Sequence, residues 1–370
     1  MSTLGIDLGT TNTAAALDGG LLSFTDGQRS QPVLPSVVAY PPTGAVLVGA
    51  SARRRRAIDP KNTIFSAKRI IGRGWFARET REFQDRYPFA LVRTPADLPA
   101  FQTRAGLLAP TDIAARVLAA VRAQVPVGAT LSEIVVGVPS GFATEQRVAT
   151  LDAVRQAGFG RARVIDEPVA TAWAYLHDDR PAGRYAAVYD LGGGTFDLAV
   201  LDCADAPFRV LAHGGDLYLG GDDVDGALAT WAAAEVLREH RWDLRDEPEV
   251  FDRLVVECER AKIRLSYAAQ TRIELAEVDP AAPLAAGGLV LARPQLADLC
   301  TDLVRRTFGI CDRVLGQAGL KARDVGAVFL AGGSCLLPML RGAVEQYFGS
   351  PARCDFDPME VVAIGASRAR

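Results

Sequence analysis

Two short stretches of the sequence combine carboxylates, glycines and hydroxyls at matching positions. The first reads LGIDLGTTNTAAAL (Leu4–Leu17) and the second reads AVYDLGGGTFDLAV (Ala187–Val200). In each, apolar residues lead to an aspartate, a Leu-Gly pair, a small turn, a threonine and renewed apolar alternation. The key aspartates, Asp7 and Asp190, lie 183 residues apart, about half the chain, so the pattern is an internal repeat.

The two turns have the composition of an anion-binding loop. A turn of Gly and Thr between strands points backbone N–H groups into one concavity, and the absent Cβ atoms let phosphate oxygens approach the backbone. Thr10, Thr11, Asn12 and Thr195 add side-chain donors. A single copy is more simply a tight β-turn with Asp as its turn former. Two copies half a chain apart favour phosphate binding.

The paired aspartates predict a bound cation. We expect Asp7 and Asp190 to face each other across a cleft, and two close carboxylates repel unless a cation lies between them. Mg²⁺ that is bridged through water to phosphate is the usual solution. Asp197, which follows the second glycine turn, is a third candidate ligand.

The elements that position these residues are those of an α/β protein. Strand-like runs alternate with helical patterns such as Thr111–Gln124 and Asp298–Gln317. A second repeat pairs Glu133–Phe142 with Ala327–Pro338, each a buried strand that enters a small-residue turn. Each is followed by a helix rich in small residues, and we expect these two helices to pack closely where the lobes join. They are Asp166–Tyr175 and Asp357–Ala369.

A chain of 370 residues is longer than a single hydrophobic core usually accommodates, which favours two lobes. We predict lobe I over residues 1–175, with a small subdomain at about 35–110. Lobe II then covers 176–370, with a mostly helical subdomain at about 222–290. No low-complexity segment separates the lobes, so the hinge should be short.

Composition excludes several classes of protein. The net charge of −3 argues against a nucleic-acid partner. The N-terminal residues lack a secretory signal pattern, and no apolar run is long enough for a membrane span. Six well-separated cysteines without a C-x-x-C pair indicate thiols of a reducing compartment, so we expect a cytoplasmic protein. The basic run Arg53–Arg56 is typical of a solvated surface.

Lysine is rare in this chain, which makes each lysine more informative. Only four of the 41 basic residues are lysines, namely Lys61, Lys68, Lys262 and Lys321. A lysine inside a motif with chemical potential is therefore less easily explained as incidental.

With these motifs in place, the chain resembles nearly end to end the nucleotide-binding domain of an Hsp70 (DnaK-type) chaperone. This family belongs to the actin, sugar-kinase and Hsp70 ATPase superfamily. The resemblance is carried by the motifs GIDLGTTN, LPSVVAY, NTIFSAKRIIGR, YDLGGGTFD, LGGDDVD, ECERAKIRLS and AGGSCLLP. It implies an α/β fold of two similar actin-like (ribonuclease-H-like) lobes that face a central nucleotide cleft.

The resemblance also implies cofactors and roles. ATP or ADP would bind with Mg²⁺, with K⁺ as a further candidate ion, and slow hydrolysis would drive a conformational switch. The catalytic candidates are Asp7, Lys68, Glu167, Asp190 and Thr195, and the metal candidates are Asp7, Asp190 and Asp197. The nucleotide-binding candidates are Gly9, Thr10, Thr11, Asn12, Gly192, Gly193, Gly194, Thr195, Gly220, Gly221, Asp222, Glu259, Lys262, Ile263, Ser266, Gly332, Gly333, Ser334 and Leu336.

Several of these residues also have simpler interpretations. Lys68 could be an exposed helix charge, and Lys262 could form a helix-surface ion pair with Glu259. Glu167 could be a first-turn acid that stabilises the helix beginning at Pro168. The Gly220–Asp222 segment could be a plain helix entry with Asp222 or Asp223 as its cap.

The sequence departs from the family at the base-binding end. Two arginines sandwich the adenine in many Hsp70 proteins, and the matching positions here are Ile263 and Leu336. Each lost stacking contact removes about 0.5–2 kcal/mol of cation–π energy. We therefore predict a site that is intact at the phosphates and looser at the base. Two further departures are Asn12, where the family has tyrosine, and Met359, where it has an acidic residue.

The resemblance implies an adenine nucleotide as ligand, with a J-domain co-chaperone and a nucleotide-exchange factor as partners of a monomer. Arg163 matches a J-domain contact, although an exposed strand-end charge would look the same. No peptide-binding domain is present in this sequence, which leaves open an ATPase domain of a longer chaperone or a stand-alone protein. The rival functions are a nucleotide-gated regulatory module with little hydrolysis and a sugar kinase of the same superfamily.

Overall fold

The computed structural model describes residues 2–26, 29–56, 58–177, 183–280 and 288–369. The chain divides into two compact units. Unit 1 comprises Met1–Arg184, Leu201–His213 and Cys354–Arg370, and unit 2 comprises Tyr185–Val200 and Gly214–Arg353.

Unit 1 is built on a six-stranded sheet with the order β14-β13-β1-β2-β3, in which β6 also pairs with β2. The central strand β1 is parallel to β13 and antiparallel to β2. Buried apolar runs fill β1 and β13, as expected for central strands that are covered on both faces. The strands are β1 (Ser2–Leu8), β2 (Asn12–Leu17), β3 (Gly20–Leu21), β6 (Val33–Pro35), β13 (Leu131–Val138) and β14 (Ala162–Asp166).

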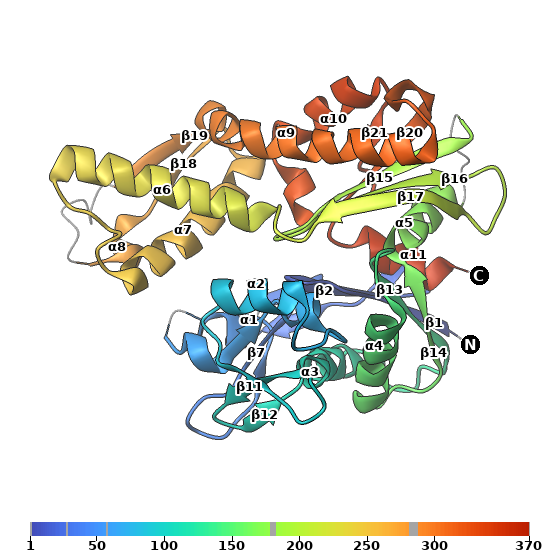
Figure 1. Ribbon diagram of the computed structural model, residues 1–370, viewed down its shortest axis with the longest axis horizontal. Helices are drawn as coiled ribbons and strands as arrows, with labels where there is room; N and C mark the ends of the chain where they lie inside the picture. Colours follow the sequence, from blue (N-terminus) through green and yellow to red (C-terminus); the bar gives the residue numbers. More distant parts are fainter. Residues whose placement is uncertain (1, 27–28, 57, 178–182, 281–287, 370) are drawn as a thin grey trace. The chain divides into compact units, whose positions relative to one another are not determined.

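Smaller sheets and several helices complete unit 1 (Figure 1). The additional strands are β4 (Phe24–Asp26), β5 (Arg29–Gln31), β7 (Val37–Ala39), β8 (Leu47–Val48), β9 (Thr63–Phe65), β10 (Leu91–Arg93), β11 (Pro99–Thr103) and β12 (Gly106–Leu108). The helices are α1 (Ala50–Arg53), α2 (Arg78–Arg86), α3 (Pro110–Arg122), α4 (Thr144–Gln156), α5 (Glu167–Leu176) and α11 (Val361–Arg368), with 3₁₀ turns η1 (Pro60–Asn62) and η2 (Ala67–Ile70).

Unit 2 repeats the sheet of unit 1. Its order is β17-β16-β15-β20-β21, with β15 parallel to β20 and β20 parallel to β21. Strand β15 therefore occupies the place of β1, which agrees with the duplicated sequence pattern. The strands are β15 (Tyr185–Leu191), β16 (Phe196–Asp202), β17 (Arg209–Asp216), β20 (Val325–Ala331) and β21 (Ala352–Arg353).

Helices and one further hairpin complete unit 2. The helices are α6 (Gly221–His240), α7 (Pro248–Tyr267), α8 (Leu275–Val278), α9 (Arg293–Ala318) and α10 (Leu340–Phe348), with η3 (Ala322–Asp324) and η4 (Gly333–Leu336); the hairpin is β18 (Gln270–Ile273) and β19 (Leu289–Ala292). Helix α9 contacts strand β15 of the sheet: the buried Tyr189 hydroxyl of β15 hydrogen-bonds Thr307 Oγ1 of α9 at 2.7 Å. The elements α6–α8, β18 and β19 occupy the predicted helical subdomain, of which residues 281–287 lie outside the described residues.

The α/β fold class predicted from the sequence is confirmed, but the unit boundaries differ from the predicted lobes. Residues 176–184, 201–213 and 354–370 were expected in lobe II and group with unit 1. The C-terminal helix α11 belongs there because it packs on β1 and α5. A Cβ atom at Gly5 of β1 would collide with the backbone of Ala363 and Ser367, so the helix lies directly on the strand.

The two small-residue helices predicted to pack closely are α5 and α11. A Cβ atom at Gly365 would collide with the Ala170 carbonyl, so the two backbones are in contact through this glycine. Both helices lie in unit 1, whereas the sequence placed them in different lobes.

Candidate functional site

The first hairpin, between β1 and β2, carries Asp7 and the Gly9–Thr11 turn. Asp7 lies near the end of β1 and is half-buried, and Asn12 is the first residue of β2. A Cβ atom at Gly9 would collide with the Asn12 carbonyl oxygen, so this turn requires glycine.

A serine that sequence reasoning did not select fixes the shape of this turn. The Ser36 hydroxyl donates to the Gly9 carbonyl at 2.8 Å and lies 2.9 Å from Thr13 Oγ1. The Ser36 N–H donates to the Thr11 carbonyl at 2.9 Å. Its position in LPSVVAY, between two short strands, gives no local signal that it reaches the turn.

Lys68 is placed by a short, tightly anchored segment. Lys68 is the second residue of η2. This turn begins directly after Ser66, whose backbone is left-handed with φ 58°. The Lys68 ammonium donates to Glu167 Oε1 at 2.7 Å, and both side chains are 12% exposed. Lys68 is therefore not the exposed charge that was its simpler interpretation.

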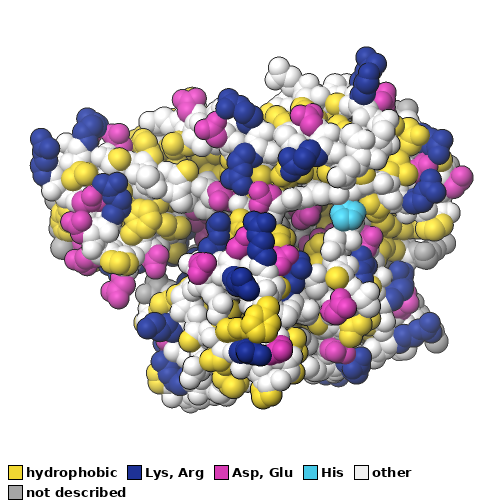
Figure 2. Space-filling model, viewed as in Figure 1, with side chains coloured by type: hydrophobic (Ala, Val, Ile, Leu, Met, Phe, Trp, Pro, Cys, Tyr) yellow, Lys and Arg dark blue, Asp and Glu magenta, His cyan; other side chains and the backbone are white. Residues whose placement is uncertain are grey.

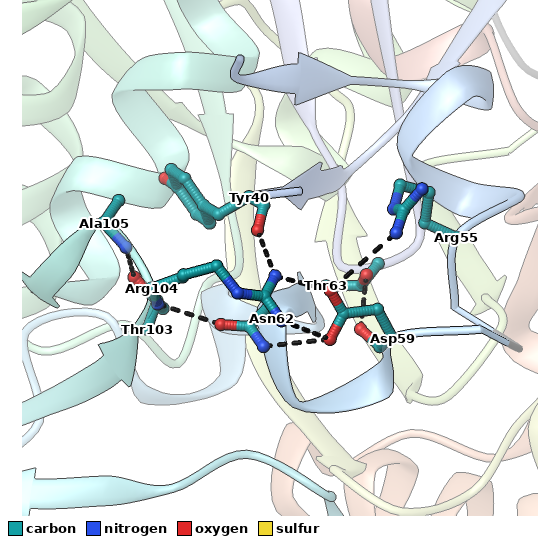
Figure 3. A network of polar contacts seen from close by, with 8 residues as sticks. All are labelled: Tyr40, Arg55, Asp59, Asn62, Thr63, Thr103, Arg104 and Ala105. Carbon is teal, nitrogen blue, oxygen red and sulfur yellow. Dashed lines mark hydrogen bonds and ion pairs between the residues drawn. The ribbon is translucent and has the colours of Figure 1, made fainter. Parts of the chain in front are cut away.

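Upstream of Lys68, a polar network holds the chain in place (Figure 3). Arg104 donates to the Tyr40 carbonyl at 2.8 Å and to Asp59 Oδ2 at 2.7 Å. Asn62 donates to Asp59 Oδ1 at 2.9 Å, and its own Oδ1 accepts from the Arg104 N–H at 2.9 Å. This network fixes η1 and thereby the start of β9, the strand that leads into η2.

Glu167 begins helix α5, with Pro168 in the first turn. A carboxylate in the first turn complements the helix dipole, as the simpler interpretation expected, and Oε1 also accepts from the Lys68 ammonium. The catalytic role of Glu167 stays a prediction. A Cβ atom at Gly137 of β13 would lie 3.3 Å from Glu167 Cγ, so this glycine leaves room for the side chain.

The electrostatics of Asp7 connect these residues. The pKa of Asp7 is raised to about 7, chiefly by burial and next by the negative charge of Glu167, while the Lys68 ammonium opposes both effects. A half-buried carboxylate beside a second carboxylate favours a cation with oxygen ligands. Mg²⁺ fits this donor chemistry.

The second hairpin carries the glycine triplet. Asp190 lies near the end of β15, and Gly192–Thr195 form the turn that follows. The Gly192 N–H donates to the Thr195 carbonyl at 2.9 Å. A Cβ atom at Gly332, which has φ +82°, would lie 2.5 Å from Asp190 Oδ1. Gly332 therefore has to be a glycine for the Asp190 carboxylate to lie against it.

Asp197 lies on β16, where its carboxylate contacts the next strand. A Cβ atom at Gly215 of β17 would lie 2.5 Å from Asp197 Oδ1. Within the described residues, no group of three or more His, Cys, Asp and Glu side chains is arranged to hold a metal ion. The assignment of Asp7, Asp190 and Asp197 as metal ligands stays a prediction.

The first residue of helix α6 is hydrogen-bonded to the glycine turn. The Gly221 N–H donates to the Gly192 carbonyl at 3.1 Å, and the Ser334 hydroxyl donates to the same oxygen at 2.8 Å. Gly220 is the residue that precedes α6, and its N–H donates to Asp223 Oδ2 at 2.8 Å. The N-cap is therefore Gly220, and neither Asp222 nor Asp223 holds that position as the simpler interpretation expected; Asp223, in the first turn, bonds back to the N-cap N–H.

Lys262 forms an ion pair that sequence reasoning did not find. Its ammonium donates to Asp225 Oδ2 at 2.8 Å and to the Gly221 carbonyl at 2.9 Å. The predicted alternative was a surface pair with Glu259 on the same helix. The pair observed is nearly buried and joins α7 to α6, with Lys262 and Asp225 side chains 11% and 5% exposed.

The remaining candidates lie on the same elements of unit 2. Glu259, Ile263 and Ser266 lie on α7, and Gly333 and Leu336 belong to η4. Ile263 is 49% exposed, which leaves its aliphatic side chain available for contact. Leu336 is half-buried.

Arg163, the candidate partner contact, is not a free strand-end charge. On β14 it pairs with Glu133 of β13 at 3.0 Å and donates to the Ala369 carbonyl at 3.0 Å. It thus holds the residue that follows α11 against the sheet of unit 1.

Charge is mixed over the surface. Figure 2 shows Lys and Arg interspersed with Asp and Glu on the visible face. In the run Arg53–Arg56, Arg55 pairs with Asp59 at 3.9 Å and Arg56 lies 4.0 Å from the Phe65 ring centroid. Among the helices of the described chain, none has the length and apolarity that crossing a membrane requires.

Comparison with known proteins places this fold and these motifs in one family. The Hsp70 protein family matches residues 3–369, so the chain belongs to the Hsp70 family. A relative is the chaperone protein DnaK of Stenotrophomonas maltophilia (strain R551-3), which is 39% identical over 375 aligned positions. The match covers 98% of this chain and 58% of that protein, so the chain spans well under two thirds of the relative's length.

Proposed function

We propose that this chain binds MgATP, hydrolyses it slowly, and serves as the ATPase part of Hsp70-type chaperone action. The observation that carries the proposal is the pair of hairpins, each with an aspartate near a strand end followed by a glycine- and threonine-containing turn; in the first turn, Gly9 cannot gain a Cβ atom without a collision. The one named relative is called a chaperone protein, which supports the biological context.

The proposed chemistry relies on positioning more than on a strong base, as is usual for phosphoryl transfer. Backbone N–H groups and hydroxyls of Thr10, Thr11 and Gly193–Thr195 would hold the β- and γ-phosphates. Asp7 and Asp190 would hold hydrated Mg²⁺, which when bound supplies neutralisation of phosphate charge. K⁺ is a second candidate ion.

Lys68 and Glu167 would orient the attacking water together with Thr195. The 2.7 Å contact between Lys68 and Glu167 supports this role, because each side chain restricts the orientation of the other. The ammonium would also oppose the negative charge that develops on the transferred phosphoryl group. ATP binding and hydrolysis would then drive a conformational switch that a partner reads.

The experiment that tests this function is ATP turnover of the wild-type protein beside Lys68→Ala. We expect a slow wild-type rate and a loss of about 100-fold or more in the variant. Lys61→Ala is the matched control, because Lys61 is an exposed lysine in the same segment and should leave the rate unchanged. A wild-type rate no higher than that of Lys68→Ala would overturn the ATPase assignment and leave a nucleotide-binding module.

The partners and location are part of the same proposal. A J-domain co-chaperone would dock near Arg163, and a nucleotide-exchange factor would act on the nucleotide-bound protein. A cytoplasmic location agrees with the six cysteines, none of which forms a disulfide in the structure as described.

A further inference from the structure

A buried carboxylate beside the glycine turn has no role in the proposed chemistry. Asp225 lies in the second turn of α6 and is 3% exposed. Its Oδ2 accepts from Lys262, and its Oδ1 has no hydrogen-bond partner among the described residues. Half of this carboxylate is therefore desolvated without compensation, which is costly for a charged group.

Stability alone does not account for such a residue. Replacing a buried ion pair with apolar residues of similar volume is often neutral or stabilising. The pKa of Asp225 is raised to about 7, chiefly by burial, even though the Lys262 ammonium opposes this rise. The carboxylate is thus held in an environment that penalises its charged form.

The contacts of Lys262 lead from Asp225 to the glycine turn. The ammonium donates to Asp225 Oδ2 and to the Gly221 carbonyl, and the Gly221 N–H donates to the Gly192 carbonyl. A Cβ atom at Gly221 would lie 2.8 Å from Lys262 Nζ and 2.6 Å from Ser334 Oγ. The Lys262 and Ser334 side chains therefore both lie against Gly221 and leave no room for a side chain there.

We propose that Asp225 is a positioning residue that holds Lys262 against the first residue of α6 and thereby fixes the glycine turn Gly192–Thr195 for nucleotide binding. Asp225 itself touches no nucleotide in this proposal. Without the negative charge of this carboxylate, one of the two acceptors that fix the Lys262 ammonium is weakened to a neutral one, and the Gly221–Gly192 contact loses support. The inference rests on the proposed nucleotide-binding function.

The test compares Asp225→Asn with the wild type by MgADP titration calorimetry and by the kcat and KM of ATP turnover. We expect the Kd for MgADP and the KM to rise about tenfold, the loss that corresponds to replacing a hydrogen bond between two charged groups with one to a neutral amide oxygen. We expect kcat to change less than twofold, since Asp225 would not touch the reacting atoms. Glu235→Gln is the matched control, because this half-exposed carboxylate lies further along α6 and forms its ion pair with the exposed Arg238.

A double-mutant cycle separates positioning from general destabilisation. If Asp225 acts through Lys262, Asp225→Asn should not change the Kd further in a Lys262→Met background. Urea unfolding of each variant shows that it is folded, and the apolar pair Asp225→Leu with Lys262→Met supplies a second folded background. A wild-type Kd for Asp225→Asn, or additive effects in the cycle, would overturn the inference. Failure of the wild type to bind MgADP at all would instead overturn the proposed function.

Discussion

At the scale of single residues, the least expected feature of this chain is the buried pair of Asp225 and Lys262. This ion pair joins helices α6 and α7 across 37 positions of sequence. Its cationic member is one of the four lysines of the chain. The pair has a consequence for stability that is independent of any ligand.

The titration of Asp225 should make stability fall as the pH rises. Its pKa in the folded protein is about 7, above the usual 3.8, so between about pH 4 and 7 the native state binds a proton that the unfolded chain has lost. The free energy of unfolding therefore contains a contribution that is present at low pH and is lost through this window. From pH 5 to 8 the contribution falls by about 2.6 kcal/mol.

Urea unfolding of wild type and Asp225→Asn at pH 5 and pH 8 checks this expectation. The variant lacks the titration, so its free energy of unfolding relative to wild type should improve by about 2.6 kcal/mol between pH 5 and pH 8. Glu235→Gln should follow the wild-type curve. Parallel pH dependence of wild type and Asp225→Asn would contradict the assignment.

The aliphatic residue at the base-binding end gives a second prediction at this scale. Ile263 is 49% exposed on α7, so an arginine there has room to extend toward a base. Ile263→Arg should lower the Kd for MgADP about two- to thirtyfold, the range that corresponds to one cation–π contact.

Calorimetry with MgADP measures this change against a charge-matched control. Val290→Arg adds the same charge at a position on β19 that is 53% exposed and is not a candidate site residue. An equal gain in affinity from both substitutions would point to general attraction of the anion and would count against base contact at position 263.

At the scale of elements, the glycine contact between α5 and α11 is the most demanding packing feature of unit 1. Gly365→Ala would place a Cβ atom on the Ala170 carbonyl, so the helices have to separate. We expect a loss of about 1–3 kcal/mol in the free energy of unfolding, as for other overpacked sites.

A second helical glycine provides the control for this prediction. Gly309 lies in the interior of α9, and a Cβ atom there would meet nothing within 4 Å. Gly309→Ala should therefore increase the free energy of unfolding by about 0.5–1 kcal/mol, because alanine has the higher helix propensity. Equal effects of the two substitutions in urea unfolding would mean that the α5–α11 contact is not tight.

Local repetition explains why much of this element-level structure could be predicted. Each hairpin encodes its own strands, turn and aspartate within about 14 residues, so Asp7 and Asp190 could be placed at strand ends from their neighbours alone. The helix predicted over Asp298–Gln317 is present but begins earlier, at Arg293, because Pro294 and a Gln295 contact to the Ala292 N–H start it there.

Features that depend on packing between distant segments could not be predicted in this way. Ser36 reaches the Gly9 turn only because β6 pairs with β2. Asp225 meets Lys262 only because α6 packs on α7, and nothing in LGGDDVD distinguishes it from its neighbouring aspartates. The grouping of the C-terminal helix α11 with unit 1 could not be predicted either. Its small residues indicate close packing, but they do not indicate that the partner strand is β1.

At the scale of the whole molecule, nucleotide binding should stabilise the folded chain by mass action. A ligand at 100 times its Kd adds about 2.7 kcal/mol to the free energy of unfolding, which for a chain of this length corresponds to about 3 °C in the midpoint of thermal unfolding. The shift should depend on Mg²⁺, because the Asp7 carboxylate beside Glu167 lies in an environment that favours a cation.

Thermal unfolding with ADP and MgCl₂, with ADP and EDTA, and with MgCl₂ alone checks this dependence. We expect the full shift only when ADP and Mg²⁺ are both present, and a shift in Asp7→Asn that no longer responds to Mg²⁺. Since asparagine removes a carboxylate that burial penalises, this variant should also remain folded without ligand. An equal shift with EDTA would contradict the metal assignment, and the absence of any shift would contradict nucleotide binding.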